Sequence, residues 1–61
     1  MATFEIFQSH DRQYGWRLRA ANGETIATSG TLYVTKAAAQ RAIEAVKRAA
    51  LEASSRDLTQ A

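Results

Sequence analysis

The dipeptide Asn22-Gly23 constrains the fold of this 61-residue chain most strongly, because it separates two segments with the alternation typical of β-strands. Asparagine and glycine tolerate the positive φ angles that tight hairpin turns require. The preceding segment alternates apolar residues with Arg17 and Arg19, and the following one is rich in β-branched residues. We therefore predict a β-hairpin around this dipeptide. Its two strands are residues 14–20 and 24–29.

The length of the hairpin loop decides which side chains share a face, since directly opposed residues point the same way. A two-residue loop would place Ile26 on the face that carries the arginines. A three-residue loop, Ala21-Asn22-Gly23, sets Leu18 opposite Ile26 and Trp16 opposite Thr28, so that the large apolar residues lie together. We predict the three-residue loop, with its glycine in the left-handed region.

The rest of the chain predicts one more strand before the hairpin and one helix after it. Residues 3–9 alternate apolar and polar side chains, and any register that joins their apolar face to the hairpin's sets Glu5 opposite Arg17 or Arg19. Strong helix formers fill residues 36–53, preceded by a good N-cap at Thr35. The segment 56–59, "RDLT", is predicted as a short final strand.

These elements form one domain, residues 1–61, of the α+β class: a three-stranded antiparallel meander, one helix and a short C-terminal strand (β3-αβ). A chain of this length buries only about 60% of the surface that its unfolded form exposes. There is no cysteine and one histidine, which excludes disulfides, thiolate zinc sites and multi-histidine metal sites within one chain. We therefore expect a second copy of the chain to supply the missing core, as a homodimer.

Three groups of residues are candidates for contact with a partner. Phe7 lies beside Arg17 and Arg19 on the outer sheet face, where an aromatic ring and two cations suit single-stranded nucleic acid but also suit ordinary cross-strand pairing. Basic side chains on the helix could meet phosphates, or could simply be solvated. Leu51 on the polar side of the helix and Leu58 in the final strand are candidate dimer contacts. The basic helix residues are Arg41, Lys47 and Arg48.

Catalysis has little support in the sequence. His10-Asp11 is the only neighbouring histidine–carboxylate pair, and adjacent residues in a turn seldom align as a base and its orienting group. No glycine-rich phosphate loop is present, so no nucleotide or other cofactor is expected. No apolar run reaches the roughly 20 residues of a membrane span, and no signal peptide is recognised, so we expect a cytoplasmic protein without membrane contact.

Three segments in order, "WRLRAANGETIATSG", "TKAAAQRAIEAVKRAA" and "RDLT", resemble the YegP-like family of small bacterial proteins, a domain of unknown function. The resemblance extends from about Phe4 to Thr59. It implies β3-αβ units that assemble in pairs with exchanged C-terminal strands, and therefore a homodimer for a chain with one such unit. It implies no catalytic or binding residue. The function that we expect is a non-enzymatic homodimeric interaction module, the alternative being a weak nucleic-acid-binding module.

Overall fold

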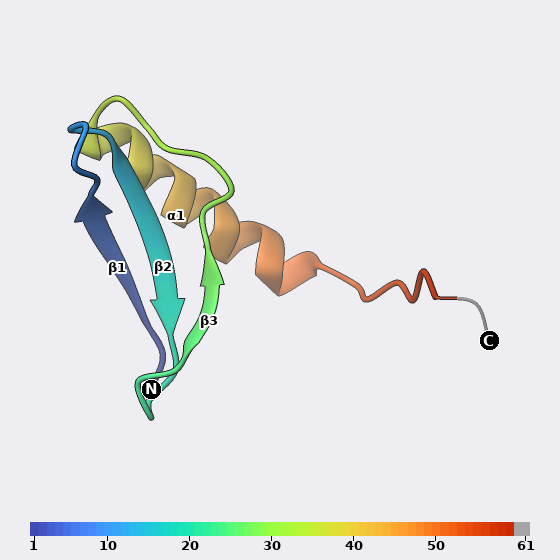
Figure 1. The fold of residues 1–61 in the computed structure, drawn as a ribbon. Helices are drawn as coiled ribbons and strands as arrows, with labels where there is room; N and C mark the ends of the chain where they lie inside the picture. Colours follow the sequence, from blue (N-terminus) through green and yellow to red (C-terminus); the bar gives the residue numbers. More distant parts are fainter. Residues whose placement is uncertain (60–61) are drawn as a thin grey trace.

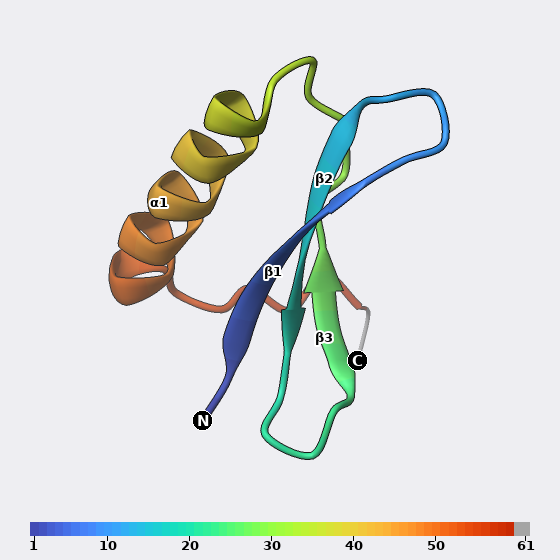
Figure 2. The same ribbon diagram turned by 90° about the vertical axis from the view of Figure 1, so that its left-hand side faces the viewer.

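In the computed structural model, which describes residues 1–59, one antiparallel sheet is covered on one face by a single helix (Figure 1). The strands β1 (Thr3–Gln8), β2 (Tyr14–Arg19) and β3 (Thr25–Thr28) lie in the order β1-β2-β3, and the helix α1 (Lys36–Glu52) follows them. Figure 2 shows α1 beside the sheet as a second layer. The predicted three-stranded meander with one helix is thus confirmed.

Residues 53–59, the described part of the C-terminal segment, form no strand. Residues 53–59 leave the end of α1 and run away from the sheet as an extended tail (Figure 1). Leu58 in this tail is 83% exposed. The predicted strand at 56–59 therefore has no pairing partner within one chain, because the tail never approaches the sheet edges of its own chain.

The first hairpin joins β1 to β2 in a register that sets Glu5 opposite Arg17, one of the two partners that the alternation allows. Phe4 pairs with Leu18 and Ile6 with Trp16, so these four apolar side chains share the face that α1 covers.

The second hairpin combines the predicted loop with an irregularity that the sequence did not reveal. The amide of Gly23 donates to the carbonyl of Ala20 at 2.9 Å, and Gly23 has a φ of 89°, so the three-residue loop is confirmed. A β-bulge then shifts the register between Leu18 and Arg19, and Leu18 pairs with Ala27 rather than with Ile26.

This bulge also overturns the predicted partner of Trp16. The amide of Ser29, not a group of Thr28, donates to the Trp16 carbonyl at 2.8 Å. Ile26, which we placed in the core, is 58% exposed, because the extra residue in β3 removes it from the regular pairing. The predicted pairs assume that one register holds along the whole hairpin, and the bulge breaks that assumption.

The helix begins as predicted, since the Thr35 hydroxyl accepts a hydrogen bond from the amide of Ala38 at 3.1 Å. Its burial fades along its length. Ala39 and Ile43 are buried and Val46 is half-buried, whereas Ala49 and Ala50 are exposed. The sheet of a single chain therefore covers only the first half of the apolar helix stripe.

Gly15, the second residue of β2, permits a second, smaller apolar contact on the outer face of the sheet. A Cβ atom at this position would lie 2.6 Å from the Phe7 ring and 3.2 Å from the Leu32 side chain. Phe7 therefore packs directly over the glycine backbone, which explains a glycine inside a strand.

Replacing Gly15 with alanine should lower the free energy of unfolding by about 1–2 kcal/mol, because the Phe7 ring must move away from its packed position. Urea denaturation followed by the fluorescence of Trp16, the only tryptophan, measures this change. Gly30→Ala is the matched control, since nothing lies within 4 Å of a Cβ there and the φ angle is not positive. A Gly15→Ala protein as stable as wild type would contradict the packing described.

Candidate functional site

The outer face of the sheet carries a three-residue charge cluster. The Nε atoms of Arg17 and Arg19 each donate to Oε1 of Glu5 at 2.8 Å, and the Arg19 guanidinium also donates to the carbonyl of Gly23 at 3.1 Å. All three charged side chains are between one third and two fifths exposed. The two candidate arginines are therefore engaged with one carboxylate, which leaves the cluster one net positive charge.

Phe7 does not offer an open ring for base stacking. The Arg17 guanidinium carbon lies 5.4 Å from the ring centroid, in cation–π geometry, while the ring itself packs over Gly15 near Leu32. The candidate outer surface of Phe7, Arg17 and Arg19 is thus brought together as predicted, but Arg17 already contacts the Phe7 ring and both arginines pair with Glu5. Sequence reasoning missed Gly15 and Leu32, although a glycine within the aromatic stretch "YGW" is a signal of close approach.

Hydrogen bonds from Arg17, and after them from Arg19, lower the pKa of the Glu5 carboxyl below its ordinary value of 4.5. The charged form of Glu5 is consequently favoured in the folded chain. This cluster holds β1 to β2 on the face opposite α1 and contributes to stability only while Glu5 is ionised.

The candidate basic residues of α1 fall into two environments. Arg41 and Arg48 are exposed. Lys47 lies closer to the sheet, with its Nζ atom 3.3 Å from the Glu44 carboxylate and 5.9 Å from the centroid of the Phe4 ring. Glu44 therefore interrupts the predicted basic face, and the Lys47 side chain lies at the boundary between the helix and the sheet.

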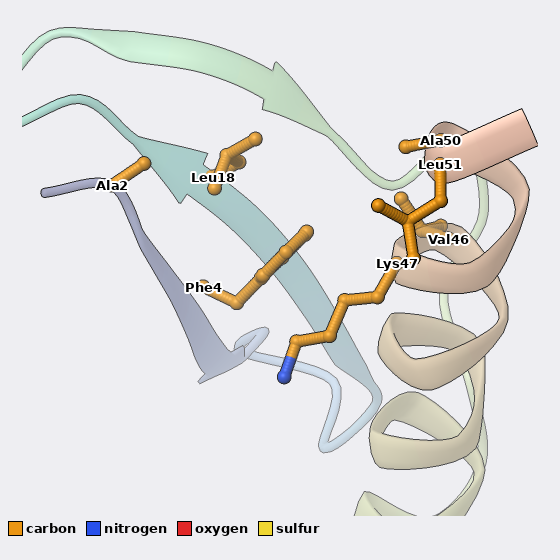
Figure 3. A pocket seen from close by; sticks show the side chains of 7 residues that line it. All are labelled: Ala2, Phe4, Leu18, Val46, Lys47, Ala50 and Leu51. Atoms are coloured by element: carbon orange, nitrogen blue, oxygen red, sulfur yellow. The ribbon is translucent and has the colours of Figure 1, made fainter. Parts of the chain in front are cut away.

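An apolar cleft opens between the second half of α1 and the ends of β1 and β2 (Figure 3). We call this cleft, with a volume of about 460 Å³, the wedge. Phe4 and Leu18 point into it from the sheet, and Lys47 stands at its rim. Leu51, a predicted dimer contact, lies on its helix side and is 87% exposed. The wedge is lined by Ala2, Phe4, Leu18, Val46, Lys47, Ala50 and Leu51.

The Phe4 ring connects the wedge to the core. It meets the buried Trp16 ring edge-on, with centroids 5.6 Å apart and an interplanar angle of 71°. The wedge is thus a continuation of the layer between sheet and helix that the chain itself leaves open to solvent. Its position could not be read from the sequence, where the second half of the alanine stripe looks like any other buried face.

The turn between β1 and β2 uses its polar residues for its own structure. The Ser9 hydroxyl donates to the Asp11 carboxylate, and the Ser9 amide donates to the carbonyl of Gln13 at 2.7 Å. Arg12 takes a positive φ of 68° at the tip. The carboxylate of Asp11 is therefore held by serine rather than aligned with the exposed His10. In the part of the chain that the structure describes, no three histidine or acidic side chains gather into a metal-binding group.

A family described as a domain of unknown function, DUF1508, matches residues 9–57 of the chain. The chain belongs to the DUF1508 family. The UPF0339 protein Atu0232 of Agrobacterium fabrum is 44% identical over 59 residues, which cover 97% of this chain and 94% of that protein. The UPF0339 protein YegP of Escherichia coli K12 is 46% identical over 44 residues, 72% of this chain and 39% of YegP. The chain therefore spans well under half of YegP but nearly all of Atu0232.

Two solution NMR structures share this fold. A protein from Haloferax volcanii has a TM-score of 0.83 at 41% identity, covering 92% of this chain and 93% of its own. The Agrobacterium tumefaciens protein ATU0232 has a TM-score of 0.72 at 42% identity, covering 95% of this chain and 92% of its own. The resemblance to YegP-like proteins inferred from sequence is confirmed, and the names of these relatives describe no reaction.

Between residues 1 and 59, the one helix is neither long nor apolar enough to cross a bilayer.

Replacing Glu5 with glutamine should remove a pH-dependent part of the stability. Because the folded pKa of Glu5 is lowered, its contribution is complete above about pH 4.5 and disappears as the pH falls through the lower folded value. Urea denaturation between pH 3 and 7 should therefore show a smaller loss of stability toward acid in Glu5→Gln than in wild type. Glu52→Gln, which removes an exposed carboxylate at the end of α1, is the control and should retain the wild-type slope. Parallel curves for Glu5→Gln and wild type would refute the role of the cluster.

Proposed function

We propose that this protein is a non-enzymatic interaction module that works as a homodimer, with the C-terminal segments of two chains exchanged. The observation that carries the proposal is the excess of exposed surface. The chain exposes 5169 Å², whereas a compact monomer of 6.7 kDa exposes about 3,900 Å². The difference of about 1,250 Å² exceeds the roughly 800 Å² that each partner buries in a standard stable interface.

The shape of the chain supports the same proposal. Its radius of gyration is 13.5 Å, whereas a compact domain of this length has a radius of about 10–11 Å. Only Trp16, Ala39 and Ile43 are buried hydrophobic residues within the described chain. Apart from Met1, five large apolar residues of the described chain have exposed fractions between 41% and 87%. They are Ile26, Leu32, Val34, Leu51 and Leu58. An uncovered apolar set of this size favours association.

The geometry favours this function over nucleic-acid binding. A stacking surface needs free aromatic faces and free cations, but Phe7 is packed and its arginines share Glu5. Titration with single-stranded and duplex oligonucleotides at about 50 mM salt separates the two functions, because electrostatic binding is strong there. Saturable binding that weakens with salt and is lost in Arg17→Ala would support the nucleic-acid function. We expect no binding.

Size-exclusion chromatography with light scattering should give twice the chain mass at micromolar concentration. Thermal unfolding should also shift to higher temperature as protein concentration rises, because association stabilises the folded state by mass action. Truncation after Ser55 removes Leu58 and the predicted exchanged strand, so it should give the single-chain mass and a midpoint independent of concentration. A wild-type protein that is monomeric under these conditions would falsify the proposed function.

A further inference from the structure

We infer that the wedge receives Leu58 from a second copy of the chain, with Asp57 of that copy placed against Lys47 at the rim. This inference rests on the homodimer proposed above and names the contact that forms it. The wedge has an apolar floor and one cation at its edge. The tail presents one exposed leucine directly after an acidic residue. The two surfaces are complementary in hydrophobicity and in charge.

The rim cation is positioned for an intermolecular contact. Lys47 extends along the Phe4 ring, with Nζ 5.9 Å from its centroid, and reaches Glu44 at 3.3 Å (Figure 3). More than half of its side chain is exposed, so it can accept a second carboxylate. Asp57 is suited to this role, because it is an exposed carboxylate, ionised at neutral pH like any aspartate, and hydrogen bonds from the hydroxyl and the amide of Thr59 lower its pKa further.

The direction of the tail indicates that Leu58 comes from another chain. Helices whose chain turns back commonly end in a glycine with left-handed geometry. Here α1 ends at Glu52, its C-cap Ala53 has the extended angles φ −72° and ψ 141°, and the last glycine of the sequence is Gly30. The tail therefore continues outward from the helix end (Figure 1), and a sharp reversal would be needed to bring Leu58 to the wedge of its own chain.

A second copy related by two-fold symmetry fills the wedge and covers the exposed Leu58 at the same time. Each tail reaches the wedge of the other chain, so two identical contacts form and both wedges are filled. The contact would cover Leu51 and Leu58, the two most exposed large hydrophobic residues beyond the N-terminal methionine.

A charge-reversal experiment tests the contact in the full chain. Lys47→Glu and Asp57→Lys each place like charges together at both contacts, so each variant alone should dimerise at least about tenfold more weakly than wild type. In an equimolar mixture of the two variants, both contacts of the heterodimer pair opposite charges. Sedimentation equilibrium should therefore show wild-type dimerisation for the mixture and for the double variant. Arg48→Glu, the same charge change one residue away on α1 and outside the wedge, should dimerise like wild type.

The outcomes separate this inference from the proposed function. Rescue in the double variant but not in the mixture would mean that each tail occupies the wedge of its own chain. A dimeric wild type whose association is unaffected by both variants, and by Leu58→Ala, would overturn the wedge contact and leave the homodimer standing. A monomeric wild type would overturn both. Weakened single variants with no rescue in either arm would show that Lys47 and Asp57 do not meet.

Discussion

The burial of Trp16 between β2 and the first half of α1 is the interaction on which the rest of this structure depends. Trp16 is 7% exposed, and the two other buried hydrophobic residues, Ala39 and Ile43, lie on the first two turns of the facing helix. Phe4 closes one side of the indole with an edge-on ring contact. A large aromatic residue contributes more buried area than any other side chain, so one tryptophan can anchor a helix whose own stripe is mostly alanine.

The same alanine stripe limits how far this core extends. Alanine allows the helix to lie close to the sheet but buries little apolar area at each turn. Beyond Val46 every residue of the helix is exposed, and the two layers separate into the wedge. Leu51 and the tail that follows it therefore lie where the helix is not covered by the sheet of its own chain.

Much of this fold could be predicted from the sequence because it depends on local patterns. Strict alternation located the strands and limited the cross-strand partner of Glu5 to Arg17 or Arg19, and Gly23 located the three-residue loop. The bulge at Ile26 was not predicted, because it changes the register within a strand without changing the alternation that reveals the strand. Cross-strand pairing also brought Arg17 and Arg19 beside Phe7 as expected, whereas the packing of Phe7 over Gly15 depends on the registration of two strands. The wedge could not be predicted from the sequence, because it arises from the angle between the sheet and the helix and not from any single segment.

The location of the wedge next to β1 matters for how a second chain would add to the sheet. The β3 edge is short and bulged, and beyond it the chain returns to β2 through paired backbone hydrogen bonds between Tyr14 and Tyr33. Such features hinder the addition of another strand. The β1 edge is longer and regular, and Ala2 and Phe4 at its start line the wedge. A tail with Leu58 seated in the wedge would therefore lie beside the one sheet edge that is open to pairing, so that apolar docking and strand addition would reinforce each other.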